Sequence, residues 1–318
     1  MDIEKQMLIA KGTFKHLPGI KKLLPSHKTA GTIESRYCYT VWLRHLKSWG
    51  KVNSGIPLKV AELGPGDSLG TGFAALLSGS MQMYAFDVEK YWDNERNVRV
   101  FNELVELFHQ RADLPDHTAY PKVRPAPSDF GFPGNILTND VLKASLDPAR
   151  IEAIRHEIMN IDSETNTFIK YKIPWHDPEI LDPGSIDFIY SQAVLECIDD
   201  LENTYRAMCR WLKSTGLMSH TIDFKSHGLT MEWNGHWKFS DHEWFLVKGG
   251  RSFLINRQPV SGHLELLRKF GFEIIARQDV KKENRLDRKI LAERFRGLSD
   301  EDLKTSGTYL LSKKGRNC

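Results

Sequence analysis

The segment Lys59–Gly70 constrains the fold more than any other part of the chain. It reads Lys-Val-Ala-Glu-Leu-Gly-Pro-Gly-Asp-Ser-Leu-Gly, which is an apolar strand, a glycine-rich turn and the start of a helix. Glycines in such a turn can take positive φ and let a ligand approach the backbone closely. Open α/β sheets bind ligands beyond the carboxyl ends of their strands. The segment therefore predicts a ligand site on a mostly parallel sheet.

Strand-like and helix-like segments alternate along the chain, which predicts an α/β, Rossmann-like fold with helices on both faces of a seven-stranded, mostly parallel sheet. We place the N-terminal helical segment at residues 1–50 and the sheet domain at 51–318. Residues 93–165 and 223–260 are expected to form two insertions, one helical, that make the cap or acceptor region. Predicted strands cover 59–63, 81–86, 167–171, 186–191, 217–222, 272–276 and 308–312. Predicted helices cover 35–48, 73–77, 100–108, 148–160, a segment from Asp199 or Asp200 to Gly216, and 262–270.

Composition excludes several classes of protein. The chain has 318 residues, 41% of them hydrophobic, and a formal net charge of +3, which is typical of a globular protein without a strong attraction to nucleic acid. No run of about 18 apolar residues is present, and the N-terminus does not resemble a signal peptide. The four cysteines form no C-x-x-C pair, so we expect reduced thiols and a cytoplasmic location.

Residues 11–28 combine five lysines with apolar residues. One interpretation is a helix that docks on the domain and is interrupted by Pro18. The other is a weak contact with an anionic membrane surface, which would need a longer apolar face.

Two acidic residues flank the predicted ligand site. Glu62 precedes the turn near the end of the first strand, and Asp87 follows the second, where a carboxylate can accept both hydroxyls of a ribose. Either a dinucleotide or S-adenosylmethionine has such a ribose. The glycines are spaced G-x-G-x-x-x-G, not the dinucleotide G-x-G-x-x-G, and Asp67 would repel a pyrophosphate at the helix N-terminus. An acid-lined turn favours the sulfonium and ammonium groups of S-adenosylmethionine.

The stretch Glu62-Leu63-Gly64-Pro65-Gly66, with Asp87 after the second strand, resembles the first motifs of the class I S-adenosylmethionine-dependent methyltransferases. Residues 186–196 resemble that family's fourth-strand motif, S/D-F-D-x-V-x-x-x-x-V-L-x-H. The resemblance runs from about residue 58 to 312 and implies a methyltransferase domain at 51–318. The resemblance and the glycine-rich turn together predict the cofactor-binding residues, which are Glu62, Gly64, Pro65, Gly66, Asp67, Asp87, Val88, Ser191 and Gln192.

The sequence departs from the family pattern in two places. Ser68 stands where many members have a third glycine. Cys197 replaces the common histidine after the fourth-strand motif, so that position offers no histidine base. By analogy with the family, residues 171–175 are expected near the adenine.

His220, Asp223 and His227 follow one another in and after the predicted fifth strand. The carboxyl end of that strand is expected to face the methyl acceptor. A neutral histidine can take a hydroxyl proton, and Asp223 can orient it, so we assign these three residues as catalytic. Two alternatives stay open. The three could hold a divalent metal, or His220 could be a buried polar residue of the strand. Our assignment includes no metal.

The segment after the fifth strand is rich in tryptophan, histidine and acids. Aromatic faces flanked by polar groups suit sugar rings, and an arginine can bind a phosphate or carboxylate. An ordinary aromatic core is the alternative. The predicted substrate-binding residues are Trp233, His236, Trp237, His242 and Arg257.

Together with residues 35–43, the pattern resembles bacterial methyltransferases of surface-polysaccharide biosynthesis. That resemblance implies an O-methyltransferase acting on a sugar, glycan or lipid-linked acceptor. Two other functions were weighed. An NAD-dependent sugar oxidoreductase or epimerase would need the dinucleotide glycine spacing, and the chain also lacks an evident Tyr-x-x-x-Lys pair. A non-catalytic glycan-binding module would bind sugar without turnover.

Overall fold

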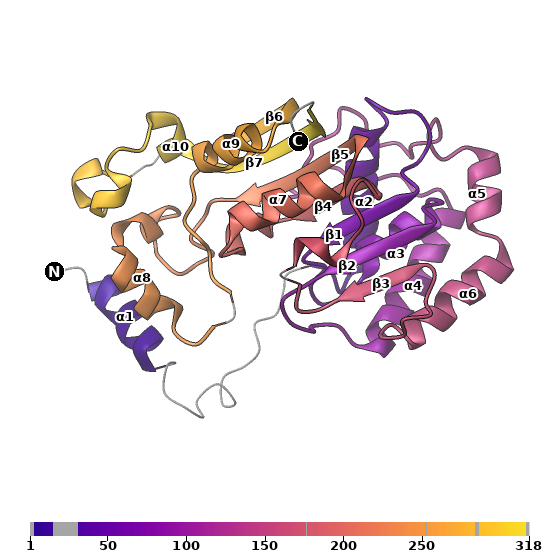
Figure 1. The fold of residues 1–318 in the computed structure, drawn as a ribbon, viewed down its shortest axis with the longest axis horizontal. Coiled ribbons are helices and arrows are strands. Elements are labelled where there is room, and N and C mark those ends of the chain that lie inside the picture. The colour runs from indigo at the N-terminus through magenta and orange to yellow at the C-terminus, as the bar shows by residue number, and fades with distance from the viewer. Residues whose placement is uncertain (1–2, 15–30, 176, 252, 284–285, 316–317) are drawn as a thin grey trace.

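The computed structural model describes all residues except 1–2, 15–30, 176, 252, 284–285 and 316–317. Seven strands form one sheet in the order β3-β2-β1-β4-β5-β7-β6 (Figure 1). The strands are β1 (Lys59–Leu63), β2 (Gln82–Phe86), β3 (Ile169–Lys172), β4 (Ile186–Gln192), β5 (Leu212–Asp223), β6 (Phe272–Lys281) and β7 (Thr305–Lys314).

The first five strands pair in parallel, and β7 runs antiparallel to both β5 and β6. The carboxyl ends of β1, β2, β4 and β5 therefore meet at one edge, where the glycine-rich turn lies. This confirms the predicted Rossmann-like, mostly parallel sheet. The helical insertion between β2 and β3 and the second insertion after β5 are also present.

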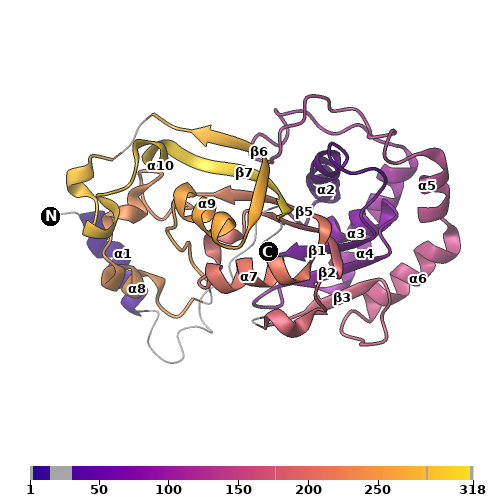
Figure 2. The ribbon, with the colours of Figure 1, turned by 45° about the horizontal axis from the view of Figure 1, so that its top comes forward.

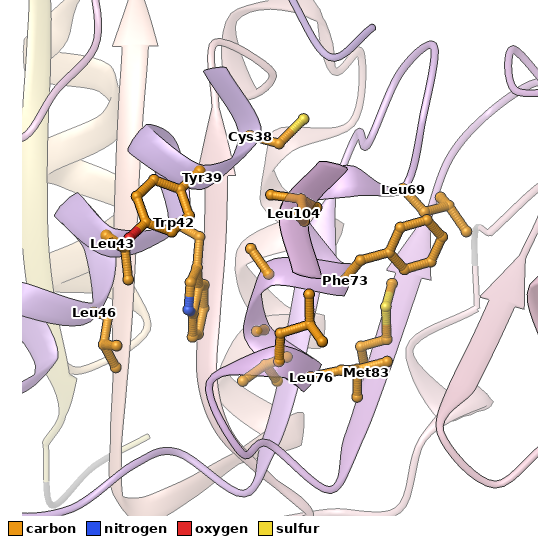
Figure 3. Close-up of a cluster of buried hydrophobic side chains, with 14 of the residues drawn as sticks. Cys38, Tyr39, Trp42, Leu43, Leu46, Leu69, Phe73, Leu76, Met83 and Leu104 are labelled. Carbon is orange, nitrogen blue, oxygen red and sulfur yellow. The ribbon is translucent and has the colours of Figure 1, made fainter. Parts of the chain in front are cut away.

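One face of the sheet is covered by a large apolar cluster that includes side chains of α2, α3, α4 and α6. Figure 3 shows Trp42 and Tyr39 of α2 beside Phe73 and Leu76 of α3 in this cluster. The opposite face packs against α7 and α9. The bounds of these helices are α2 (Ser35–Trp49), α3 (Gly70–Leu77), α4 (Asn94–His109), α6 (Pro148–Met159), α7 (Leu201–Trp211) and α9 (Val260–Lys269). A short helix, α5 (Asn139–Ser145), was not expected from the sequence.

A smaller cap lies at one end of the sheet (Figure 2). It is built from α1 (Ile3–Phe14), α8 (Asp241–Lys248), α10 (Asp300–Lys304) and the loops between them, and it has two small apolar cores of its own. The N-terminal helix α1 belongs to this cap because it packs on α8. Its Gly12 lies so close that an added Cβ would be 2.1 Å from the carbonyl oxygen of Leu246. By contrast, α2 belongs to the sheet core.

Two expectations are wrong. The helix predicted to end at Gly216 ends at Trp211, and Gly216 lies inside β5, which starts at Leu212. The N-terminus of that helix is as expected, since Asp200 caps it. The expectation of reduced thiols fails for one pair, because Cys209 and Cys318 form a disulfide. Cys38 and Cys197 are free.

No helix in the described part of the chain is long and apolar enough to span a bilayer. Most of the basic segment 11–28 lies outside the described residues. Its first four residues form the last turn of α1.

Candidate functional site

The glycine-rich turn after β1 has the backbone conformation that its sequence predicts. Gly64 and Gly66 have φ of 66° and 75°. The Gly64 N–H donates to the Phe86 carbonyl at 2.8 Å, and a Cβ on Gly64 would lie 2.5 Å from a methyl of Val194. The Gly66 N–H points at Asp87 Oδ2, 3.4 Å away. Backbone pairing thus brings the ends of β1 and β2 together around one turn.

Ser68, which departs from the family pattern, connects the turn to the segment before α2. Its hydroxyl donates to the carbonyl of Thr32, and its N–H donates to Thr32 Oγ1 at 3.2 Å. The Gly70 N–H in turn donates to Ser68 Oγ. The adjacent Asp67 carbonyl accepts from Arg96 at 2.9 Å. The two bonds from Ser68 hold Thr32 against the turn.

Two acidic side chains beside the turn are buried. Glu62 is 6% exposed and accepts a hydrogen bond from the Tyr190 hydroxyl at 3.3 Å, and burial raises its pKa to about 8. Asp87 is 7% exposed and accepts from the Val88 N–H at 2.7 Å, and burial raises its pKa to about 6. Neither carboxyl forms an ion pair within the described residues. Uncompensated buried carboxyls fit a cationic ligand and do not fit a pyrophosphate.

The remaining predicted cofactor residues differ in accessibility. Val88 is exposed, and Gln192 is half-buried at the last position of β4. Ser191 is fully buried, and its hydroxyl lies 2.8 Å from His220 Nδ1. Among residues 171–175, which were expected near the adenine, one aromatic side chain lies at the strand end and another lies in the core. Tyr171 lies at the end of β3 with its ring 5.3 Å from that of Trp92, whereas Trp175 packs in the core on Phe86 and Trp211.

The structure separates His220 from the other two predicted catalytic residues. His220 is 2% exposed, and burial lowers its pKa to about 3, so it is neutral and bonded to Ser191 inside the sheet. This matches the alternative of a buried polar residue. Asp223 and His227 do come together at the end of β5, where Asp223 Oδ2 is 3.8 Å from His227 Nε2. Burial also lowers the pKa of His227.

A third side chain, to which the sequence pattern assigns no role, joins this pair. Glu196 follows β4, is 3% exposed, and places Oε1 3.7 Å from His227 Nε2. Burial, and then the charge of Asp223, raise the pKa of Glu196 well above its usual value. The acid belongs to the fourth-strand motif, but its partner lies 31 residues further on, so only the pairing of β4 with β5 places the two side chains together.

The helical insertion also reaches this end of the sheet. The Arg124 carbonyl accepts a hydrogen bond from Thr221 Oγ1 on β5 at 3.2 Å. The charge of Lys122 acts on His227 and helps to lower its pKa. This position is compatible with the expected role of residues 93–165 beside an acceptor.

Most of the predicted substrate-binding residues pack inside the cap. Trp237 is fully buried, and its Nε1–H donates to the Arg257 carbonyl at 3.0 Å. The Arg257 guanidinium is also buried, where it donates to the Phe239 carbonyl and to Asp241. These two residues match the alternative of an aromatic core.

The other three predicted substrate-binding residues differ in exposure. His236 is buried next to Trp237, and burial lowers its pKa to about 3. Trp233 is 8% exposed, and His242 is exposed on α8. No group of three His, Cys, Asp or Glu side chains among the described residues has an arrangement that could hold a metal ion.

Comparisons with known proteins complete the description of the site. No protein-family model and no curated protein matches the sequence. Solved structures resemble it at low identity. A SAM-dependent methyltransferase from Methanosarcina mazei is 12% identical, with a TM-score of 0.43 and coverage of 84% of this chain and 97% of that one. Phosphoethanolamine N-methyltransferase 2 from Haemonchus contortus, in complex with S-adenosyl-L-methionine, is 13% identical, with a TM-score of 0.43. The match covers 86% of this chain and 52% of that one.

Proposed function

We propose that the chain is an S-adenosylmethionine-dependent methyltransferase that binds its cofactor at the turn between β1 and α3. The observation that supports this most is the pair of buried carboxyls, Glu62 and Asp87, beside glycines of positive φ. A cationic ligand would offset the cost of burying them. The residues proposed to hold the ligand are Glu62, Gly64, Pro65, Gly66, Asp67, Asp87, Val88 and Gln192. When bound, this cofactor supplies a methyl group on a sulfonium, which is a good leaving group.

The proposed acceptor is a hydroxyl of a sugar, glycan or lipid-linked precursor, as in the synthesis of a surface polysaccharide. His227 is the proposed base, because its lowered pKa keeps it neutral at pH 7 and Asp223 lies beside its ring. Alignment of the acceptor oxygen with the sulfonium would supply much of the rate. The cytoplasmic location stays a prediction.

Calorimetry with S-adenosylhomocysteine tests the cofactor site. We expect binding by the wild type and at least about tenfold weaker binding by Asp87→Ala, because charge-assisted hydrogen bonds to the ribose are lost. Asp140→Ala is a matched control, since that aspartate is exposed on α5. Undiminished affinity in Asp87→Ala would contradict the placement. Enhanced NADH fluorescence on mixing would favour a dehydrogenase instead.

The acceptor is tested by mass spectrometry of candidate glycan precursors after incubation with isotopically labelled S-adenosylmethionine. The expected product carries one labelled methyl group, and His227→Ala is expected to reduce its rate of formation by about 10²–10⁴-fold. Glycan binding without any mass gain would identify a non-catalytic module.

A further inference from the structure

Glu196 lies beside the proposed base, yet it has no role in the function proposed above. It is the middle residue of the 3-10 turn η3 (Leu195–Cys197), which follows β4. The side chain is 3% exposed, and no side chain in the described part of the chain donates a hydrogen bond to its carboxyl, on which only the backbone N–H groups of Glu196 and Asp223 act as donors. Burying a carboxyl that no side chain pairs is costly, so this residue requires an explanation.

The backbone around Glu196 is firmly held. The Asn256 N–H donates to the Glu196 carbonyl at 2.6 Å. The Asn256 side-chain amide donates to the carbonyls of Leu195 and Ile198, each at 2.8 Å. One residue of the second insertion therefore fixes the whole 3-10 turn. The position of the carboxyl is consequently set by the fold.

Two carboxyls converge on one ring nitrogen of His227. Glu196 Oε1 is 3.7 Å and Asp223 Oδ2 is 3.8 Å from Nε2. Asp223 is already engaged, since it accepts from Lys225 Nζ at 2.6 Å and from the Lys225 N–H at 2.9 Å. Glu196 accepts no hydrogen bond from a lysine in the described part of the chain. The His227 side chain is 37% exposed, so the ring also has an open side.

We propose that Glu196 is a positioning residue that, with Asp223, accepts the Nε2–H of His227 and leaves Nδ1 free to take the acceptor's proton. The inference rests on the proposed role of His227 as the base. Which ring nitrogen of a histidine carries the proton is decided by the hydrogen bond that the other nitrogen makes. Distances slightly too long for a hydrogen bond in a free enzyme can shorten when substrate binds.

The chemistry balances with these residues. The acceptor oxygen forms a bond to the methyl carbon, the electron pair of the broken C–S bond stays on sulfur, and the hydroxyl proton passes to Nδ1. The negative charge of Asp223, which raises the pKa of His227, remains beside the new imidazolium. That charge stabilises the protonated ring.

Other titratable groups also act on this cluster. Lys122 from the first insertion and Lys225, two residues after the end of β5, carry positive charge toward His227. His236 of the cap is the other ring that interacts with it. Burial, and then the charges of Glu196, Asp223 and Asp199, raise the pKa of the Cys197 thiol. Among the described groups, Asp223 carries the negative charge that raises the pKa of His227, and Glu196 is the second carboxyl within 4 Å of its Nε2.

Nitrogen-15 NMR of the full chain, labelled at histidine, tests the proposal without an acceptor. In the wild type we expect the neutral ring of His227 to carry its proton on Nε2. Glu196→Ala is expected to shift the population toward the Nδ1–H form and to lower the pKa of His227 by about 1. Glu196→Gln keeps an oxygen acceptor, so it should retain both the tautomer and the pKa of His227. Glu265→Gln, at an exposed position of α9, is the matched control.

The proposal is overturned if Glu196→Ala leaves both the tautomer and the pKa of His227 unchanged. It is also overturned if Glu196→Gln and Glu196→Ala show the same ratio of the two neutral tautomers of His227. Affinity for S-adenosylhomocysteine, measured on the same samples, separates the two hypotheses. Failure of the wild type to bind that ligand would count against the proposed function, whereas the ring measurement tests Glu196 alone.

Discussion

At the scale of single residues, Glu62 combines a binding role with a cost in stability. Its carboxyl is buried, receives a hydrogen bond from Tyr190, and has no cation beside it in the described part of the chain. Burial raises its pKa from 4.5 to about 8. Because the folded state holds this proton more tightly, the stability it contributes is fully present below pH 4.5 and is lost as the pH rises through 8.

Glu62→Gln is therefore expected to raise the free energy of unfolding at pH 8 by about 1–3 kcal/mol, because the ionisable group is removed. The same variant should bind S-adenosylhomocysteine more weakly, because the ligand's ammonium loses its carboxylate. Denaturant unfolding and calorimetry measure the two effects. A more stable variant with wild-type affinity would show that Glu62 does not face the ligand.

At the scale of elements, the packing of α1 on α8 completes the cap. Lys5 of α1 forms an ion pair with Glu243 at 2.8 Å, and its ammonium lies 5.5 Å from the centre of the Phe239 ring. Gly12 permits the close approach of the two helices, because its missing side chain leaves room for the backbone at Leu246 and Val247. The contact joins segments more than 200 residues apart in the chain.

Gly12→Val is expected to detach α1, since the new side chain would collide with the backbone of α8 and not with a flexible side chain. Hydrogen exchange should increase in α1 and α8 while the sheet stays protected. Gly134→Ala is the control, because nothing lies within 4 Å of an added Cβ there. Unchanged exchange in α1 of Gly12→Val would show that the packing is looser than described.

At the scale of the whole molecule, buried histidines and buried carboxyls have opposite effects on the free energy of unfolding as the pH falls. Burial lowers the pKa of four histidines from 6.5 to about 3, so the stability they provide is lost as the pH falls from 6.5 toward 3. Burial raises the pKa of the three carboxyls at the site, which therefore favour the folded state as the pH falls toward about 4.5. The two effects oppose each other above pH 4.5. The histidines are His45, His220, His236 and His263, and the carboxyls are Glu62, Asp87 and Glu196.

Below pH 4.5 the four histidines continue to act, at about 1.4 kcal/mol per pH unit each. Together they amount to about 5.5 kcal/mol per pH unit, which is comparable to the whole stability of a domain. We therefore expect cooperative acid unfolding between about pH 4.5 and 3, followed by circular dichroism. His263→Gln, which can keep the contact with Tyr205, should reduce the proton uptake on unfolding by about one. A wild type that stays folded at pH 3 would contradict this account.

The amino-acid sequence by itself determined the elements and the cofactor turn, because those signals are local. Apolar periodicity marked the seven strands, and the glycines at 64 and 66 marked the positive φ values that the structure shows. The boundary of α7 was misplaced because Gly216 was interpreted as a helix end, whereas the pairing of Leu212 with Ile186 of β4 extends β5 back to Leu212.

The tertiary structure alone decided which side chains meet. His220 and His227 look equivalent in the sequence, but strand alternation buries the first against Ser191 and the turn after β5 places the second near Asp223. Glu196 joins His227, Cys209 joins Cys318, and α1 joins α8 only through long-range packing. Such contacts depend on strand order and burial, which are properties of the assembled core and leave no periodic pattern in the chain.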